Sequence, residues 1–349
     1  MKLAIVIVSY NGLKYLPAAL KSCKDFAPHC QVYLVENASS DGSLEYIQKN
    51  WPKVKLFPQA TNLGFAEGNN VGLRQAMSEG AEAIFLLNQD AELTSGSLDK
   101  LESYLSTHPK VGMVQPRLSL PNGRINSLGN CYHYLGFGFA GGNGLSYEEA
   151  LRRLHWFKNQ TEIPYASGAG VLLRSQALKQ VGLFDQTLFM YHEDLELSLR
   201  FRSFGWRLEI LPEAEVIHHY QFSASSNNFY YMERNRLSVW LSYFKLPTLI
   251  LLFIPWLISE LALLLTSLFN GWSGAWWRAR RYFFNKEIWQ YLTSKRQQLR
   301  KTRKVNDRLL LSFASGSIHF QEKDRWFVRY LFNPLSAVGW LLIKPLIRW

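Results

Sequence analysis

The apolar positions of the first 90 residues fall into short runs that are separated by amphipathic segments. Residues 3–8, 32–35, 54–57 and 83–87 are mainly apolar. Between them, residues 13–23, 44–50 and 71–77 have helical spacing, with Leu13, Leu16 and Leu20 on one face of the first segment. Short continuous apolar runs are typical of strands that are buried on both faces. The alternation predicts an α/β fold with a parallel, doubly wound sheet.

Polar side chains follow three of these predicted strands. Tyr10 comes after the first strand, Glu36 and Asn37 come at the end of the second, and Asn88 and Asp90 follow the run at 83–87. The carboxyl ends of neighbouring strands meet at the edge where open α/β sheets bind ligands, so we expect these side chains to converge. A ring, amides and carboxylates suit a planar base and a ribose. The Asp90 carboxylate suits a hard divalent cation, or alternatively an ordinary helix cap.

A polar, Gly-rich loop at residues 61–70 adds Asn62 and Gly64 as candidates for contact through backbone N–H groups. The same residues, and Asp41-Gly42, are also ordinary turn chemistry. No P-loop and no dinucleotide Gly-x-Gly-x-x-Gly follows the first strand. Further along, we expect a helix over 98–105, a strand over 111–118, and a mobile loop over the site at 129–147.

A second polar centre lies between residues 165 and 219. Small residues at 166–170 allow a ligand to approach the backbone closely. Glu193, Asp194 and Glu196 begin a helix predicted to run to residue 204. These acids either complement the helix dipole or include a general base. A strand over 214–217 ends at His218, which either completes a metal site with Asp90 or is structural.

Charge divides the chain near residue 270. Residues 271–349 hold 16 Lys/Arg and 4 Asp/Glu, a net charge of +12, so the first 270 residues carry 39 − 16 = 23 basic and 27 − 4 = 23 acidic groups. Basic and aromatic residues beside apolar segments favour an anionic membrane surface as partner. Nucleic acid is disfavoured, because no recognised nucleic-acid-binding module accompanies the charge. We therefore predict two domains, residues 1–240 and a basic, Trp-rich membrane-associated helical region at 241–349.

Two apolar segments lie in this second region. Residues 246–269 are long enough to span a bilayer but contain Pro247, Pro255 and Glu260, and a carboxylate within a span is costly without a partner. Residues 326–349 form the second segment. We expect in-plane or re-entrant helices on the cytoplasmic leaflet, with a single span and a soluble helical subdomain as alternatives.

The three cysteines are odd in number and widely spaced, which argues against a disulfide framework or a zinc site and favours the reducing cytosol. The apolar run at the N-terminus is too short for a signal peptide.

In order and spacing, these motifs resemble those of family-2 glycosyltransferases of GT-A fold, especially the bacterial rhamnosyltransferase-like branch that builds surface polysaccharides. The resemblance covers about residues 1–240. The residues that carry it are Val8-Ser9-Tyr10-Asn11, Val35-Glu36-Asn37-Ala38-Ser39-x-Asp41-Gly42-Ser43, Asn62-x-Gly64-Phe65-Ala66-x-Gly68-Asn69-Asn70, Leu87-Asn88-Gln89-Asp90, Ser167-Gly168-Ala169, Gly182-x-Phe184-Asp185, and Glu193-Asp194-x-Glu196-Leu197 with Gly205-Trp206.

The resemblance implies a Rossmann-like, mixed but mostly parallel sheet flanked by helices. It also implies a nucleoside-diphosphate sugar donor (dTDP- or UDP-linked), a divalent metal (Mg²⁺ or Mn²⁺), and inverting transfer of one sugar to a lipid-linked or polysaccharide acceptor, with L-rhamnose as the sugar expected from the branch. The enzyme would work at the cytoplasmic face of the inner membrane, peripheral or single-span. The implied site residues are Tyr10, Glu36 and Asn37 for base and ribose, Asn62 and Gly64 for the nucleotide pocket, Asn88 and Asp90 as an Asp-x-Asp-like motif with Asp90 on the metal, His218 as a metal or diphosphate contact, and Asp194 as catalytic base with Glu193 beside it.

Three departures from the family pattern matter. Asn88 replaces the first Asp of the Asp-x-Asp, so the metal site has less charge, and Glu36 stands where Asp is usual. The processive signature Gln-x-x-Arg-Trp is missing, which favours addition of one sugar. The Asn88 substitution keeps an alternative open, namely a weakened GT-A domain that binds a nucleotide sugar or glycan at the membrane.

Overall fold

The fold comes from a computed structural model that describes residues 1–154, 161–221, 225–319, 326 and 328–349. Its strands are β1 (Leu3–Ser9), β2 (Gln31–Glu36), β3 (Lys55–Pro58), β4 (Ala83–Leu87), β5 (Ala91–Leu93), β6 (Val111–Ser119), β7 (Ile125–Ser127), β8 (Asn130–Tyr132), β9 (Gly138–Ala140), β10 (Gly170–Arg174) and β11 (Arg207–His218). Its α-helices are α1 (Leu16–Phe26), α2 (Ser43–Asn50), α3 (Gly64–Ser78), α4 (Ser97–Thr107), α5 (Tyr147–Arg153), α6 (Ser175–Val181), α7 (Glu193–Ser203), α8 (Ser226–Tyr243), α9 (Leu246–Phe269), α10 (Ser273–Arg281), α11 (Lys286–Thr302), α12 (Asp307–Ser312) and α13 (Asn333–Ile343). Shorter helical turns are η2 (Gln186–Leu188), η3 (Tyr282–Phe284), η4 (Val328–Phe332) and η5 (Lys344–Leu346).

Within the described residues, nine strands form one sheet in the order β3-β2-β1-β4-β10-β6-β11-β5, with β7 paired to β6. β3, β2, β1 and β4 are parallel neighbours, and β6 is parallel to β11. β10 runs antiparallel between β4 and β6, and β5 runs antiparallel to β11. The predicted α/β fold with a mixed, mostly parallel sheet is confirmed.

The two faces of the sheet are buried under different helices because side chains alternate along each strand. Val6 packs in one cluster with Leu73 of α3, together with residues of α6 and α7. Its neighbour Ile5 packs in the other cluster with Leu20 of α1, together with residues of α2 and α4. Each such fully buried side chain stabilises the fold by about 1.5–3 kcal/mol. Burial on both faces explains why these strands read as continuous apolar runs.

Three predictions of local structure need correction. The helix expected from residue 71 begins at Gly64, because the polar loop before it is already helical. The loop expected at 129–147 contains the antiparallel pair β8–β9, since its Gly and aromatic residues pair across a hairpin that lacks hydrophobic alternation. The strand expected over 214–217 is longer, extending from residue 207 to His218 along β6.

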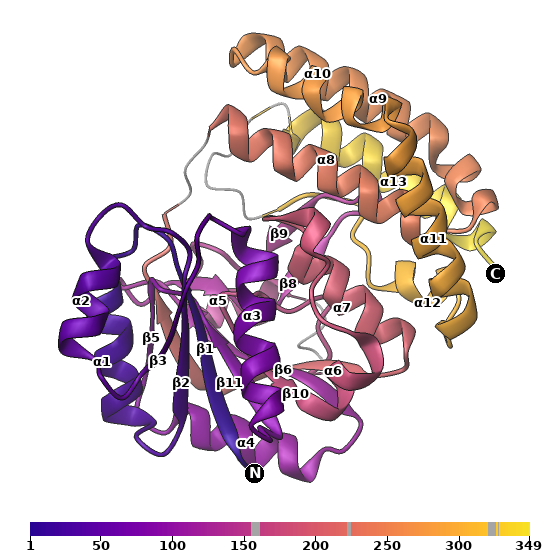
Figure 1. Ribbon diagram of the computed structural model, residues 1–349. Helices are drawn as coiled ribbons and strands as arrows, with labels where there is room; N and C mark the ends of the chain where they lie inside the picture. The colour runs from indigo at the N-terminus through magenta and orange to yellow at the C-terminus, as the bar shows by residue number, and fades with distance from the viewer. Residues whose placement is uncertain (155–160, 222–224, 320–325, 327) are drawn as a thin grey trace.

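The helices from α8 to α13 form a separate layer on the side toward which β1 and β2 point (Figure 1). The core of this helical layer includes Tyr134, Trp240 of α8, Leu252 of α9 and Trp340 of α13. The rings of Tyr134 and Trp340 stack with centroids 4.7 Å apart, and the Trp240 indole donates to the Tyr134 carbonyl at 2.8 Å. The domain boundary predicted at residue 240 falls inside α8, and the division itself stays a prediction. Of the predicted apolar segment 326–349, Phe327 lies outside the described residues.

Glu260, in the middle of α9, has the partners that its position requires. The Arg236 guanidinium of α8 lies 2.6 Å from Glu260 and 2.8 Å from Glu233. Arg280 of α10 lies 2.7 Å from Glu233 and also pairs with Glu260. Two arginines and two glutamates therefore form a buried, charge-balanced cluster that joins α8, α9 and α10.

Candidate active site

The carboxyl ends of β1, β2 and β4 lie side by side. Ser9 pairs with Glu36 across β1 and β2, and β1 also pairs with β4. Gln89 connects the loops after β1 and β4: its amide oxygen accepts from the Tyr10 N–H at 2.8 Å, and its amide nitrogen donates to the Tyr10 carbonyl at 3.2 Å. Tyr10 is 45% exposed, so it is accessible to a ligand.

Glu36 and Asn37 are more deeply placed than a direct contact with ligand would suggest. Both residues are 1% exposed. One Glu36 oxygen accepts from the Ser39 N–H at 3.0 Å. The Asn37 amide donates to the Gly64 carbonyl at 3.0 Å and accepts from the Leu63 N–H at 3.3 Å. Asn37 therefore holds the start of α3 in place, and its contact with a nucleotide stays a prediction.

The turn at Asn62 and Gly64 leads directly into α3. The Asn62 side chain accepts from the Gly64 N–H at 2.8 Å, which is the Asx-turn geometry expected from the sequence. Gly64 has φ +77°, and a Cβ there would lie 2.6 Å from the Phe189 carbonyl oxygen. Only glycine fits, because the loop that precedes α7 lies against this turn. The Ala66 N–H donates to the same Phe189 carbonyl at 3.0 Å.

Asp90 and His218 meet at the ends of β4 and β11. Asp90 Oδ1 lies 3.3 Å from His218 Nε2. His218 Nδ1 lies 2.9 Å from Asn126 Oδ1, an acceptor, so Nδ1 carries the proton and Nε2 presents its lone pair. Nε2 is buried, and no hydrogen bond of acceptable geometry reaches it from the described residues. Burial opposes ionisation of Asp90, but the positive charge of His218, when Nε2 is also protonated, outweighs burial and lowers the Asp90 pKa.

These two side chains fit a divalent cation. An unpaired imidazole nitrogen beside an ionised carboxylate is a donor set that Mn²⁺ and Mg²⁺ accept. No group of three His, Cys, Asp or Glu side chains gathers around a possible metal position in the described chain. Asp90 and His218 would therefore leave most coordination positions to phosphate oxygens and water, as Mg²⁺ sites often do.

Asp194 lies in the first turn of α7, beside Glu193. Asp194 Oδ1 accepts from the Leu195 N–H at 2.7 Å, and Oδ2 lies 3.4 Å from the Gly168 nitrogen. Burial raises the Asp194 pKa to about 6, although these N–H groups oppose the shift. Burial, reinforced by the negative charge of Asp194, raises the Glu193 pKa well above its usual value. Asp194 is thus the member of the pair suited to accept a proton near neutral pH.

Glu196, the third acid of this turn, has a structural environment. It pairs with Arg200 at 2.5 Å and with Lys295 of α11 at 3.0 Å, and it accepts from the Tyr243 hydroxyl at 2.7 Å. The excess of acids at the start of α7 is therefore explained by two different roles.

The segment 167–169 connects the two polar centres. The Gly168 nitrogen faces Asp194, and the next residue, Ala169, accepts from the Asn88 N–H at 3.0 Å. A Cβ on Gly168 would approach Phe65 at 3.0 Å, so a small residue is needed there. Asp194 and the first residue of the Asn88–Asp90 motif therefore both contact one short backbone segment.

Backbone strain in the described chain is confined to these loops. Its non-glycine residues with positive φ are Asn11, Ala38, Phe189, Tyr191 and His192. The first two follow β1 and β2, and the other three directly precede Glu193. Strained residues concentrate at functional sites, where the surrounding structure holds them.

Helix α8 holds the strained loop before α7, a role that nothing in the local sequence indicates. The Asn235 amide donates to the carbonyls of Leu188, Met190 and Tyr191 at 2.7–2.8 Å. The Arg234 guanidinium donates to the Thr187 and Leu188 carbonyls at 2.8 and 2.9 Å. Asn235 and Arg234 are buried polar residues on a helix. Their burial depends on how distant segments pack against α8, so no local sequence pattern marks them.

The sheet, the helices on its two faces and the polar centre at its strand ends define a glycosyltransferase of the GT-A type. The structure of GalNAc-T7 with UDP, GalNAc and Mn²⁺ has the same fold, with a TM-score of 0.55 and 17% identity over 70% of this chain. The match covers 48% of that chain, less than two thirds of its length. The chain belongs to the family Glycosyl transferase family 2, whose model matches residues 4–182.

Curated relatives place it within the family. It is 29% identical over 235 residues to the N-acetylglucosaminyl-diphospho-decaprenol L-rhamnosyltransferase of Mycobacterium tuberculosis, covering 62% of this chain and 76% of that protein. It is 27% identical over 219 residues to the dTDP-rhamnosyl transferase RfbF of Shigella flexneri, covering 61% and 67%. The predictions of a family-2 glycosyltransferase and of its rhamnosyltransferase-like branch are confirmed. The roles of the individual site residues stay predictions.

Proposed function

We propose that the protein transfers one L-rhamnose from dTDP-rhamnose, with inversion and with a divalent metal, to a hydroxyl of a lipid-linked glycan. The names of the two curated relatives support this donor, and the decaprenol in the first name supports a lipid-linked acceptor. A UDP-sugar is the second candidate donor. The observation that carries the proposal is that one short segment contacts both motifs. The Gly168 nitrogen faces Asp194, and the Ala169 carbonyl accepts from the N–H of Asn88, two residues before the Asp90 that lies 3.3 Å from His218.

Inversion in one step requires two separate groups. The acceptor oxygen attacks opposite the leaving diphosphate, so the group that takes its proton stands apart from the groups that hold the diphosphate. Asp194 on α7 would accept the acceptor proton, because its raised pKa leaves it basic and mostly ionised near neutral pH. Neither carboxylate is needed as a nucleophile.

Asp90 and His218 would hold the cation, with Asn126 fixing the imidazole tautomer. When bound, Mg²⁺ or Mn²⁺ supplies charge neutralisation on the departing diphosphate. Tyr10 would stack on the base, and the Asn62–Gly64 turn would line the nucleotide pocket. The hydrogen bonds of Gln89 and Asn37 would hold these loops in position.

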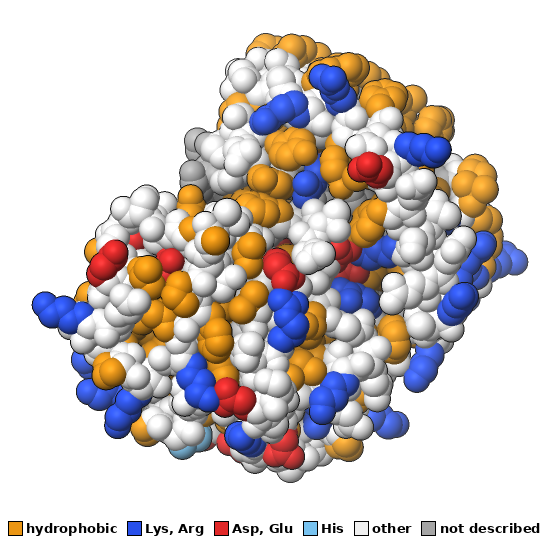
Figure 2. All heavy atoms as spheres, viewed as in Figure 1, with side chains coloured by type: hydrophobic (Ala, Val, Ile, Leu, Met, Phe, Trp, Pro, Cys, Tyr) orange, Lys and Arg blue, Asp and Glu red, His pale blue; other side chains and the backbone are white. Residues whose placement is uncertain are grey.

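The lipid-linked acceptor fits an apolar surface on the helical layer. Six apolar residues of α9 that recur every three or four positions are 57–64% exposed: Leu246, Ile250, Ile254, Ile258, Leu261 and Leu265. α13, which contacts α9, exposes Leu335, Val338, Leu341 and Leu342. Figure 2 shows hydrophobic side chains along the outer edge of this layer, with Lys and Arg beside them. An apolar face flanked by basic residues suits the cytoplasmic leaflet.

We propose that α9 lies in the membrane plane. Among the described helices it is the one long and apolar enough to cross a bilayer, by length and composition. The Glu260 cluster supports the in-plane arrangement, because a spanning α9 would break its pairs with Arg236 and Arg280 or carry those arginines into lipid. The protein should sediment with membranes from detergent-free lysate and be released by alkaline carbonate. Retention after carbonate would favour the single span, and a soluble protein would contradict both arrangements.

The reaction is tested with purified protein, dTDP-rhamnose and a polyprenyl-diphosphate-linked N-acetylglucosamine. We expect dTDP release that depends on acceptor and on Mg²⁺ or Mn²⁺, and a product linkage of inverted anomeric configuration by NMR. Release with UDP-sugars alone would move the donor assignment to them. No release with any nucleotide sugar would contradict the proposed reaction.

A second candidate function is supported by Asn88, which gives the metal motif one carboxylate fewer than the family pattern. In this alternative the domain binds a nucleotide sugar without transferring it. A thermal-shift titration separates the two, because binding without turnover would raise the unfolding temperature while nucleotide release stays at background.

A further inference from the structure

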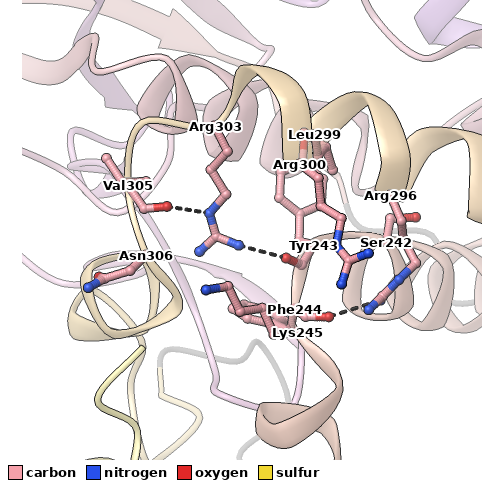
Figure 3. A pocket seen from close by; sticks show the side chains of 10 residues that line it. All are labelled: Ser242, Tyr243, Phe244, Lys245, Arg296, Leu299, Arg300, Arg303, Val305 and Asn306. Carbon is pink, nitrogen blue, oxygen red and sulfur yellow. Dashed lines mark hydrogen bonds between the residues drawn. The ribbon is translucent and has the colours of Figure 1, made fainter.

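A basic cavity lies in the helical layer, away from the ends of the sheet strands. It has a volume of about 190 Å³ and forms where the end of α8 and the start of α9 meet α11 and the turn before α12. A water molecule occupies about 30 Å³ of the liquid, so the cavity has room for a phosphate group. Figure 3 shows its basic side chains, which are Lys245, Arg296, Arg300 and Arg303.

Positive charge in this basic cavity is not balanced. None of the ten lining residues, all within the described chain, is acidic. The nearby carboxylate of Asp307 lies 2.7 Å from Arg303 Nη1. Its second oxygen accepts from the Lys245 backbone N–H at 2.8 Å and from the Thr248 hydroxyl. One carboxylate, already bonded to neighbouring groups, therefore stands against four cations.

Arg303 leaves a donor unsatisfied. Its side chain is 9% exposed. Nη1 donates to the Tyr243 carbonyl at 3.0 Å and Nε donates to the Val305 carbonyl. Nη2 is buried and has no hydrogen-bond partner among the described residues. A buried guanidinium N–H without an acceptor is costly, and an anion in the cavity would supply the acceptor.

Arg296 and Arg300 face each other across the other half of the cavity. Figure 3 shows their guanidinium groups side by side. Arg296 Nη1 donates to the Phe244 carbonyl at 2.9 Å, which fixes its position. Burial lowers the Arg296 pKa, and the positive charge of Arg300 lowers it further. Two like charges held together in this way are stabilised by an anion between them.

The position of the cavity indicates the source of that anion. Lys245 immediately precedes α9, and the exposed apolar face of α9 begins at Leu246 and Ile250. The cavity is remote from the strained loop, because Tyr231 and Tyr243 are 12 residues apart on α8, about 18 Å along the helix. Tyr231 stacks on Phe189 of that loop, whereas Tyr243 lines the cavity.

We propose that the basic cavity binds the phosphate of an anionic phospholipid head group whose acyl chains lie along the exposed face of α9. The buried Arg303 and the half-buried Arg296 supply donors that hydrogen bonds to backbone carbonyls already orient, and the exposed Lys245 and Arg300 supply further positive charge. The inference rests on the membrane attachment proposed above and is independent of the sugar donor and of the catalytic residues.

The test compares two pairs of substitutions with the same change in charge. Lys245→Gln with Arg300→Gln removes two cavity cations, and Lys301→Gln with Lys304→Gln removes two cations of the same region outside the cavity. All four side chains are exposed, so the unfolding temperature should not change. Binding of the full-length variants is measured to vesicles of phosphatidylcholine and phosphatidylglycerol in equal amounts, and to vesicles of phosphatidylcholine alone.

Each basic residue near an anionic surface contributes about fivefold, so the general loss is at most about 25-fold for either pair. We expect the cavity pair to weaken binding to the anionic vesicles by about 10-fold or more beyond the control pair, because only the cavity pair also loses charge-assisted hydrogen bonds to the phosphate. Equal losses for the two pairs would overturn the inference while leaving the membrane proposal intact. Failure of the wild-type protein to bind anionic vesicles would contradict both the cavity inference and the proposed membrane attachment, whatever the outcome of the transfer assay.

Inorganic phosphate distinguishes a lipid head group from a free anion. If phosphate raises the unfolding temperature of wild type but not of the cavity pair, while both bind anionic vesicles equally, the cavity takes free phosphate and the lipid assignment is wrong. The lipid assignment instead predicts that the cavity pair binds anionic vesicles more weakly than the wild-type protein in the same preparations.

Discussion

The two carboxylates central to the proposed reaction have opposite electrostatic environments. Asp90 is half-buried and the positive charge of protonated His218 lowers its pKa, so it remains ionised and suited to a cation. Burial of Asp194 raises its pKa to about 6, so it combines basicity with ionisation near neutral pH. Environments that separate the pKa values of two carboxyl groups in this way indicate different roles for the two groups in the reaction.

The pH dependence of transfer follows from Asp194. The carboxylate accepts a proton only when ionised, so kcat/KM should fall as the pH drops through about 6 and be level above it. This profile is measured over about pH 5 to 8, where a group tuned to work near neutrality titrates. A profile that is level across this range would exclude Asp194 as the titrating base.

The metal assignment is tested at His218. His218→Ala should weaken Mn²⁺ binding by at least about 100-fold, and Asn126→Ala, which releases the imidazole tautomer, by about 10- to 100-fold. Binding is followed by the electron paramagnetic resonance signal of free Mn²⁺. His219→Ala is the matched control, because His219 pairs with Glu92 at 2.5 Å and should leave affinity unchanged. Equal effects of the two histidine substitutions would contradict the assignment.

Asp90, Asp194 and His218 could be selected from sequence because each stands where an apolar run ends or a helix begins, which is a local signal. Asn126 could not, because it reaches His218 from 92 positions away and no pattern marks it. The depth of Asn37 was equally hidden, since its two hydrogen bonds join segments separated by 26 and 27 positions.

At the scale of elements, the loop between η2 and α7 depends on α8. Three of its residues have positive φ, and Asn235 bonds three of its carbonyls. Because the loop leads straight into Glu193 and Asp194, its conformation sets where the proposed base stands. Helix α8 therefore acts as a brace for the site although it contributes no proposed catalytic group.

Asn235→Ala should lower stability by about 1–3 kcal/mol, because its two amide hydrogens, which the three loop carbonyls share, are lost at about 0.5–1.5 kcal/mol each. It should also lower kcat by about 10-fold or more with donor affinity retained, because small displacements of a base are costly. Denaturant unfolding and steady-state kinetics measure both. Asn227→Ala, an exposed change on the same helix, should alter neither. An Asn235 variant with wild-type kcat would show that α8 does not position Asp194.

The elements that could be predicted are those whose burial leaves a periodic trace. β1, β2 and β4 are covered on both faces and read as apolar runs. β10 was not predicted, because it inserts antiparallel between β4 and β6, and pairing direction leaves no mark on composition. The β8–β9 pair was hidden because its residues are buried without alternating.

At the scale of the whole molecule, the neutral sheet and the basic helical layer are joined by α11. Lys295 of α11 pairs with Glu196 at 3.0 Å and with Asp185, which also accepts from Tyr291. Burial opposes ionisation of Asp185, but Lys295 outweighs it and lowers the Asp185 pKa to about 2. The division by charge was visible in sequence, whereas this junction depends on residues 110 positions apart.

Lys295→Met should lower the free energy of unfolding by about 3–5 kcal/mol, because it leaves the Asp185 carboxylate without its cation and leaves Glu196 with Arg200 alone. In the wild-type protein, the Asp185 contribution is present above its unfolded pKa of 3.8 and is lost as the pH falls toward about 2. The difference between wild type and variant should shrink over that interval. Lys286→Met, exposed on the same helix, should change stability by less than about 0.5 kcal/mol. Equal effects of the two changes would contradict this view of the junction.

The most direct measurement for the proposed division of labour is the transfer rate of Asp194→Asn against that of Glu193→Gln, with dTDP-rhamnose affinity measured for both. Asp194→Asn should reduce the rate by at least about 10²-fold with donor affinity unchanged. Glu193→Gln should have little effect, because burial and Asp194 keep that carboxyl protonated. A near-normal rate for Asp194→Asn, or a larger loss for Glu193→Gln, would contradict the account.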